Sequence, residues 1–295
     1  MFQKTQFFIF FFVLLSFVLK AQYTISESYL EKAVLIEFPN IGASGSGFFL
    51  SDSNYIYLVT ARHVVFHERF MASTGQIVEN RLIDTSGIVK FYSKDSDSSE
   101  ANIMTVDFAG LWNSGNLCYS INADIMVARI GSIQKKDSAK SVAIKYNSFI
   151  KRDKSSFVSR FDLTEILKFD QARISDDIFM IGYPKSLGLQ ENIQYDFNRP
   201  LLRKGILAGK YRRNKTLIVD CPSFFGNSGG PIIEIQEDNV FLLGIVTQLI
   251  PFTDRGKTFT VTQNSGFSII EPIDKIYELI NQIDLTRQYL FINKN

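Results

Sequence analysis

Short apolar segments separated by polar turns run along most of the chain, a pattern that predicts β-strands. The first strand is expected at residues 32–39, and the second, at 44–50, leads through a polar turn at 51–54 into a strand that ends at His63. Further segments of this kind lie at 87–92, 103–112, 177–184, 202–209, 216–219, 232–235 and 241–248. Segments of this length, bounded by turn residues, indicate an all-β protein.

Helical spacing is clear in one place, where Ile273, Ile276, Leu279 and Ile280 predict a helix over residues 272–283. Short helical segments are also expected at 64–70 and 163–169. Between residues 131 and 175 the sequence is rich in Lys, Ser and Asp, which predicts a connection between two β-rich halves.

The N-terminal residues 1–21 contain Lys4 followed by an apolar segment from Phe7 to Leu19. This segment is too short to span a membrane and is typical of a signal-peptide core. We expect export to the periplasm or the medium, with cleavage after Ala21 and no membrane attachment afterwards. An uncleaved anchor is the alternative, because Leu19 is larger than the residue usually found three positions before the cut.

The charge balance argues against nucleic acid as a partner. The chain is 45% hydrophobic, enough for a sizeable core, and after loss of Lys4 and Lys20 it keeps 30 basic side chains against 30 acidic ones. One basic cluster stands out, and a solvated hairpin explains it better than a preference for acidic substrates; it comprises Arg203, Lys204, Lys210, Arg212, Arg213 and Lys215.

Neither a metal nor a cofactor is expected from the sequence. His63 and His67 are four residues apart, but Val64 stands where a zinc protease of the His-Glu-x-x-His type has its glutamate. His67 is therefore expected at the surface or in packing. The only two cysteines, Cys118 and Cys221, could be neighbours, but sequence spacing does not show that they pair, and we expect buried free thiols.

The clearest chemical signal is the glycine-rich turn around Ser228, between two predicted strands. The N–H groups of Gly226 and Ser228 can point at one place and form an oxyanion hole. Gly229 and Gly230 leave room for a substrate carbonyl. A serine hydroxyl needs a neighbouring base to become a nucleophile, and the chain contains only two histidines.

The sequence Thr-Ala-Arg-His-Val at 60–64, together with Gly-Asn-Ser-Gly-Gly-Pro at 226–231, resembles the trypsin-like (chymotrypsin-fold) serine proteases, in the bacterial branch of HtrA-like and V8-like enzymes. The resemblance implies two six-stranded antiparallel β-barrels and a C-terminal helix, with His63 as base, an aspartate that orients it, and Ser228 as nucleophile. Asp124, which precedes an apolar strand, is the favoured aspartate, and Asp107 is the alternative. About 65 residues follow Ser228, so no PDZ domain is expected.

The resemblance also implies domain limits, which are a signal peptide at 1–21, an N-terminal barrel with the histidine and aspartate at 22–135, a connection at 136–175, a barrel with the serine at 176–270, and a helix and tail at 271–295. Thr247 is expected to bond the catalytic aspartate, and Gln248 to pair with substrate backbone. Pro222 and Phe224 lie ahead of the nucleophile with no acid between them, which favours a small or apolar substrate side chain. Asn227 replaces the aspartate on which trypsin-type zymogen activation depends, so we expect the protein to be active without proteolytic activation.

The sequence therefore predicts an exported serine endopeptidase that acts on proteins or peptides through an acyl-enzyme. The alternative is a binding protein that keeps the protease fold without efficient catalysis. Another acyl-transfer enzyme, such as an esterase, is less favoured because the Gly-x-Ser-x-Gly elbow is absent.

Overall fold

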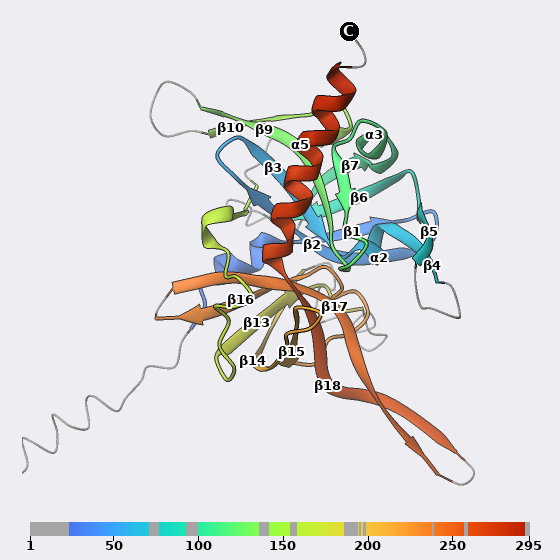
Figure 1. The fold of residues 1–295 in the computed structure, drawn as a ribbon, viewed down its shortest axis with the longest axis vertical. Coiled ribbons are helices and arrows are strands. Elements are labelled where there is room, and N and C mark those ends of the chain that lie inside the picture. Colours follow the sequence, from blue (N-terminus) through green and yellow to red (C-terminus); the bar gives the residue numbers. More distant parts are fainter. Residues whose placement is uncertain are drawn as a thin grey trace, which may run out of the picture.

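The computed structural model describes residues 24–70, 77–92, 100–135, 142–153, 158–185, 194, 196, 199–237, 239–256 and 259–292. The signal peptide expected at 1–21 lies outside these residues. Figure 1 shows two β-structures, the first built from the N-terminal half and the second from the C-terminal half, with the long helix α5 (Ile276–Ile292) lying across the first. The expected all-β fold with a C-terminal helix is confirmed.

The N-terminal half forms a ten-stranded sheet with the order β10-β9-β3-β2-β1-β6-β7-β11, while β12 pairs with β2 and β8 with β9. Its strands are β1 (Ala33–Phe38), β2 (Ala43–Ser51), β3 (Tyr55–Thr60), β6 (Ser86–Phe91), β7 (Asn102–Asp107), β8 (Leu117–Tyr119), β9 (Met126–Lys135), β10 (Val142–Tyr146), β11 (Ile150–Arg152) and β12 (Phe161–Asp162). The 3₁₀ helix η1 (Glu27–Lys32) precedes β1, and β4 (Phe66–Phe70) pairs separately with β5 (Ile77–Leu82).

The first sheet differs from the expected six-stranded barrel in extent. Strands β10, β11 and β12 come from the segment expected to connect the halves, so the N-terminal unit continues past residue 135. The 3₁₀ helix η2 (Leu163–Glu165) is all that forms of the helix expected at 163–169. Strands β10 and β11 are only five and three residues long and contain Lys145, Lys151 and Arg152, and such short strands are hard to distinguish from loops.

Two local assignments near the site are also corrected. The helical turn expected at 64–70 is helix α2 (Arg62–Val65), and strand β4 begins directly after it. The strand expected at 103–112 ends at Asp107, where helix α3 (Phe108–Asn113) begins. The Asp107 carboxylate accepts a hydrogen bond from Gly110 N at 2.7 Å, which caps this helix.

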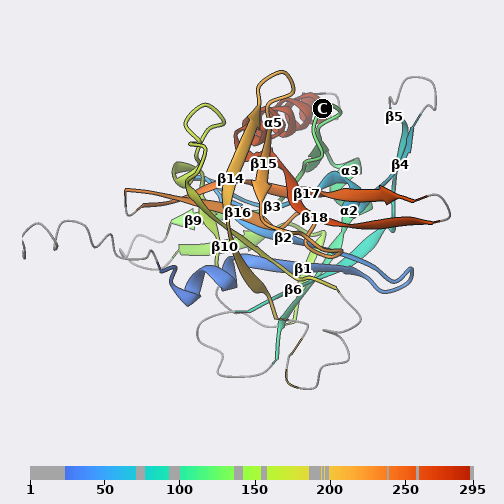
Figure 2. The same cartoon turned by 90° about the horizontal axis from the view of Figure 1, so that it is seen from below.

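The C-terminal half is a closed six-stranded barrel, as expected, with the order β13-β14-β15-β18-β17-β16. Its strands are β13 (Asp177–Gly182), β14 (Leu201–Tyr211), β15 (Thr216–Asp220), β16 (Pro231–Gln236), β17 (Asn239–Arg255) and β18 (Thr260–Pro272). Strand β18 was not expected, because its first half is polar. Figure 2 shows that β17 and β18 continue beyond the barrel as a two-stranded ribbon.

After β18 the chain returns to the N-terminal sheet through the 3₁₀ helix η3 (Ile273–Lys275) and helix α5 (Ile276–Ile292). Ile276, Leu279 and Ile283 are buried on its inner face. Arg129 of β9 is buried and forms an ion pair with Asp284 of α5. In the described residues no helix is long and apolar enough to cross a membrane.

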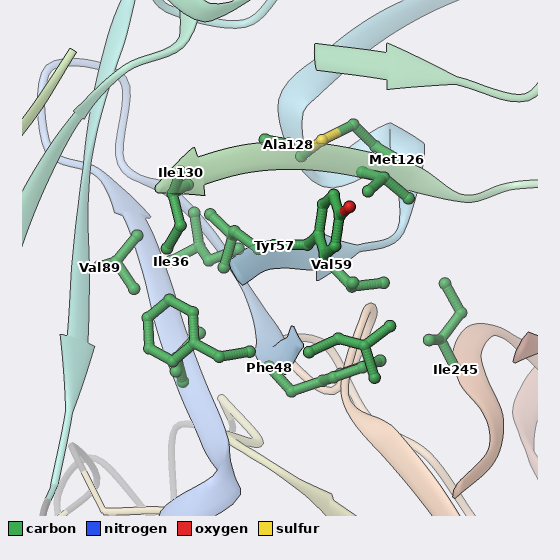
Figure 3. Close-up of a cluster of buried hydrophobic side chains, with 14 of the residues drawn as sticks. Ile36, Phe48, Tyr57, Val59, Val89, Met126, Ala128, Ile130 and Ile245 are labelled. Carbon is green, nitrogen blue, oxygen red and sulfur yellow. The ribbon is translucent and has the colours of Figure 1, made fainter. Parts of the chain in front are cut away.

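One hydrophobic core extends through the N-terminal sheet into the neighbouring face of the barrel. Figure 3 shows Phe48, Tyr57 and Met126 of the sheet in a cluster that Ile245 of β17 approaches from the barrel side. A second, smaller cluster fills the barrel itself. The two halves are therefore packed together, and Ser46 of the sheet donates a hydrogen bond to Ser228 O of the barrel half where they meet.

Candidate active site

His63 and Asp124 form a directly bonded pair. His63 lies in α2, which follows β3, and Asp124 lies two residues before the strand β9 that pairs with β3. His63 Nδ1 is 2.6 Å from Asp124 Oδ2, and the backbone N of His63 donates to Asp124 Oδ1 at 3.0 Å. These two contacts with one carboxylate fix both the backbone of His63 and the orientation of its ring. The histidine side chain is 37% exposed, against 22% for the aspartate, so the imidazole faces the accessible side.

The alternative aspartate lies in a different environment. Asp107 is exposed and its carboxylate caps helix α3. The structure thus brings Asp124, and not Asp107, to His63.

A turn at residues 120–125 holds Asp124. Ser120 N donates to Ile125 O at 3.0 Å, and the Ser120 hydroxyl accepts hydrogen bonds from Asn122 N and Ala123 N at 3.2 and 3.1 Å. The guanidinium of Arg62 donates to the carbonyls of Ser120 and, at 3.3 Å, Ala123. Sequence reasoning missed Arg62. The available signal was a cation in an otherwise apolar strand-to-helix turn.

The loop that carries Ser228 is packed against the end of β3. Ser46 N of β2 donates to Ser228 O at 2.8 Å, and Gly229 N donates to Val246 O at 2.7 Å. Gly229 has φ +84°, and a Cβ there would collide with the Thr60 hydroxyl and Ser46 O. Only glycine permits this approach. Ser228 is therefore held beside the residues that lead into His63.

The carbonyls of the peptide units that carry the Gly226 and Ser228 N–H groups are both hydrogen-bonded. Phe225 O accepts a hydrogen bond from Lys185 N at 2.6 Å, and Asn227 O accepts one from Gly230 N at 2.9 Å. In a trans peptide the N–H points away from the C=O of the same unit. The Gly226 and Ser228 N–H groups thus face away from these partners, and in the described part of the chain neither donates a hydrogen bond.

Ser46 joins the first half to the loop that carries Ser228, the candidate nucleophile, and was not recognised as a site residue. Its hydroxyl donates to Gly226 O at 2.7 Å and accepts from Tyr183 N at 2.9 Å. A serine between two glycines in a buried strand was the available signal, because a buried hydroxyl needs partners.

The residues expected to contact the substrate differ in their exposure and in their hydrogen bonds. The Thr247 hydroxyl donates to Ile269 O at 3.3 Å, so the expected hydrogen bond to Asp124 is not formed. This residue lies at an irregularity in the pairing of β17 with β18, which changes its direction. Gln248 is exposed, and Phe224 is half-exposed beneath the Arg203 guanidinium. Pro222 precedes Ser223, whose backbone N donates a hydrogen bond to the Ser268 hydroxyl at 3.0 Å.

The other titratable candidates stand apart from this chemistry. Cys118 and Cys221 are free and buried, as expected, and burial raises the pKa of each thiol to about 11, so neither is a ready nucleophile. His67 lies in β4 opposite Arg81, exposed, and does not share a helix with His63.

Together these groups can perform acyl transfer. A serine in a loop packed against the strand end that leads into a histidine, a carboxylate bonded to that histidine, and two backbone N–H groups that donate no hydrogen bond among the described residues are the kinds of group that a nucleophilic attack on a carbonyl requires.

Comparison with known proteins gives a family. Residues 45–245 match the trypsin-like peptidase domain. Among solved structures, two of the HtrA-type protease AlgW with a tripeptide, one of them of a variant enzyme, match with a TM-score of 0.46 and 16% identity. Each match covers 86% of this chain and 60% of the AlgW chain, so the chain spans about 60% of the length of those proteins. No curated protein matches.

Proposed function

The chain belongs to the trypsin-like peptidase family of serine proteases, and on that premise we propose that it is an exported endopeptidase whose triad is Ser228, His63 and Asp124. The observation that carries the proposal is the double contact of His63 with Asp124, on a helix that follows directly from the strand end against which the Ser228 loop packs. Export is proposed because the apolar segment before residue 22 is typical of a signal peptide.

In the proposed reaction the Ser228 hydroxyl oxygen attacks the scissile carbonyl carbon while His63 Nε2 takes its proton. The tetrahedral oxyanion accepts hydrogen bonds from the Gly226 and Ser228 N–H groups. His63 then gives the proton to the leaving amine as the C–N bond breaks, which leaves an acyl-enzyme ester. Water, deprotonated by the same histidine, hydrolyses the ester and restores Ser228. Asp124 holds the ring and stabilises the imidazolium.

The substrate is a protein or peptide. No acidic side chain lies between Pro222 and Phe224, and the hydroxyls of Ser223 and Ser268 are bonded to each other at 2.9 Å. The residue on the amino side of the cleaved bond is therefore proposed to be small or apolar. Because Asn227 offers no carboxylate to a new N-terminus, the mature chain is proposed to act without proteolytic activation.

The test is labelling with a fluorophosphonate, which requires an activated hydroxyl. The wild-type protein, produced from residue 22, is expected to be labelled at Ser228 and to cleave an unfolded protein. Ser228→Ala should lose both, and His63→Ala and Asp124→Asn should lower both by roughly three to four orders of magnitude. Thermal unfolding of each variant serves as the folding control.

Failure of the folded wild-type protein to react would contradict the proposal and favour the binding protein that keeps a protease fold. Labelling that appears only after trimming by another protease would contradict activity without activation. N-terminal sequencing of the exported protein tests the leader, and a start near Gln22 is the expected result.

A further inference from the structure

The outer parts of β17 and β18 form an exposed two-stranded ribbon. Strand β17 runs for 17 residues, and its residues from Pro251 onward are exposed. Figures 1 and 2 both show the ribbon extending beyond the barrel. A two-stranded ribbon has no layer to cover its apolar side chains, so an apolar residue on it requires an explanation.

The two faces of the ribbon differ. The register pairs Phe252 with Gln263 and Asp254 with Val261, and Gly256 N donates to Phe259 O at 2.9 Å, which puts the apolar side chains on one face. They are widely exposed, Phe252 by 59%, Phe259 by 58% and Val261 by 39%. The opposite face is polar, with the hydroxyls of Thr253 and Thr262 3.3 Å apart. We call the first of these the aromatic face.

The free edge of the ribbon is continuous with the nucleophile loop. Strand β16 covers one edge of β17 only as far as Ile245, and the next contacts on that edge are Val246 with Gly229 and Gly230. From Gln248 outward, no described strand pairs with this edge. A polypeptide laid along it as an added strand would reach Ser228 at one end and Phe252 at the other.

We propose that the ribbon is a distal substrate-binding surface, on which a polypeptide substrate adds a strand to β17 and places an apolar residue against Phe252 on the aromatic face. This rests on the proposed peptidase function. From Gln248 to Phe252 the strand rises about 13 Å, so the contact lies four to five substrate residues from the catalytic centre.

The size of the aromatic face favours substrate over a second copy of this chain. Three partly exposed side chains can bury at most a few hundred Å², whereas stable dimers bury about 1,600 Å². A patch of this size is too small to recruit a free partner. It can add affinity for a chain already tethered at the cleft, because the second contact is then intramolecular.

The experiment separates binding from cleavage. Binding of peptides to Ser228→Ala is measured by fluorescence anisotropy, using a short peptide around one cleavage site and versions extended at either end by six residues, with leucine or with serine at the fourth and fifth positions. We expect the leucine extension at one end to tighten binding roughly five- to tenfold over serine. Phe252→Ser with Val261→Ser should abolish this gain and leave the short peptide unchanged.

The matched control is Thr253→Ser with Thr262→Ser on the polar face, which should keep the gain. Equal binding of leucine and serine extensions, or a gain that survives loss of Phe252 and Val261, would overturn the proposal. So would a wild-type dimer in light scattering that the aromatic-face variant converts to monomer. Hydrolysis of the short peptide by the wild type tests the peptidase function separately.

Arg62 is a buried cation next to the candidate catalytic histidine, and it supports a second, independent inference. This residue precedes His63 in α2, and its side chain is only 5% exposed. Its guanidinium donates to the carbonyls of Ser120 and Ala123, which lie in the turn that ends at Asp124. Burying a guanidinium costs solvation free energy unless its N–H groups find acceptors. The hydrogen bonds from Arg62 to two carbonyls of one turn supply acceptors and fix that turn relative to α2.

We infer that Arg62 is a positioning residue for Asp124, and this too rests on the proposed function. Helix α2 then holds the turn at two places, through the Arg62 side chain on its backbone and through the two His63 contacts on the carboxylate. Loss of Arg62 lets the turn shift, and the carboxylate with it.

A double-mutant cycle tests this, with the rate of fluorophosphonate labelling of Ser228 as readout. Arg62→Met should slow labelling at least tenfold in the wild-type background and less than twofold in the Asp124→Asn background, because the same interaction is then already lost. Arg62→Lys, which keeps a donor, should recover part of the rate. Equal effects of Arg62→Met in both backgrounds, or none in either, would overturn the inference.

Discussion

Glu234 shows how a single buried acid makes stability depend on pH. Its side chain is buried in β16, where Oε1 accepts from Arg173 N at 3.4 Å and from Gln236 Nε2, and Oε2 has no hydrogen-bond partner among the described residues. Burial, helped by the nearby Asp176 carboxylate, raises the pKa of Glu234 from 4.5 to about 7. The folded protein therefore binds this proton more tightly than the unfolded chain does.

The protonated Glu234 side chain makes its full contribution to the free energy of unfolding below pH 4.5, and this contribution is lost as the pH rises toward 7. We expect the free energy of unfolding to fall over that interval by roughly 3 kcal/mol more in the wild type than in Glu234→Gln. Urea titrations of both proteins at pH 5 and pH 7.5 measure the difference, since other titrating groups are common to the two. Parallel pH dependences would contradict the prediction.

The Ser46 hydroxyl is a single buried group on which both stability and catalysis are expected to depend. Ser46→Ala removes the hydroxyl that bonds Gly226 O and Tyr183 N, and leaves the buried Tyr183 N and the partly buried Gly226 O without that partner. The expected cost is about 1–3 kcal/mol of stability, with a roughly tenfold lower kcat because Gly226 is freed. Steady-state kinetics and thermal unfolding measure the two effects.

Ser51→Ala is the matched control for Ser46→Ala. Ser51 is a buried serine in the same strand, but its hydroxyl donates to Phe161 O at 3.3 Å, away from the nucleophile loop. It should lower stability alone. Equal losses of kcat in both variants would show that Ser46 has no special connection to the oxyanion hole.

At the level of elements, helix α5 fastens the end of the barrel half to the N-terminal sheet. Arg129 of β9 pairs with Asp284 of α5, and its guanidinium lies 3.9 Å from the Tyr55 ring centre. Asp284→Ala leaves a buried guanidinium without its carboxylate. Because Asp284 itself is half-exposed, the expected loss is about 1–2 kcal/mol rather than that of a fully buried pair.

Chemical denaturation measures this loss, and Glu278→Ala is the control. Glu278 is exposed on the same helix, so its replacement should change stability by less than about 0.5 kcal/mol. If both substitutions cost the same, the Arg129 contact does not anchor the helix.

The elements also show which parts of the structure the sequence predicts. Strands with a continuous buried pattern, such as β13 and β16, were located correctly from their apolar residues alone. Strand β18 was missed, because half of it lies in the ribbon, where no core selects its residues. Helix α3 was taken for strand, because the decisive signal was one Asp107 cap within an apolar segment.

At the site, sequence order and residue type predicted the meeting of His63 with Asp124, because few histidines were available. The supporting contacts of Ser46 and Arg62 could not be predicted in this way. They join residues more than fifty positions apart through backbone carbonyls, and a carbonyl leaves no signature in the side-chain sequence. Thr247 was misplaced for a related reason, since an irregularity in strand pairing turns a side chain without changing the sequence pattern.

For the whole molecule, the candidate active site lies where the two halves meet, so their packing decides whether it persists. The main hydrophobic core contains residues of both halves, among them Tyr57 of the sheet and Ile245 of the barrel, and α5 adds Ile276 and Ile283. A shared core couples the halves energetically. We therefore expect the protein to unfold in one transition, although it consists of two β-structures.

Trp112, the only tryptophan, reports on the N-terminal half, where it contacts Phe66 and Tyr119. Ile245→Ala, made in the other half, should cost about 2–5 kcal/mol. The denaturation midpoint seen by Trp112 fluorescence should fall by the same amount as that seen by far-ultraviolet circular dichroism. A Trp112 midpoint that stays in place while the dichroism curve splits would mean that the halves unfold independently, and that the site can open between them without global unfolding.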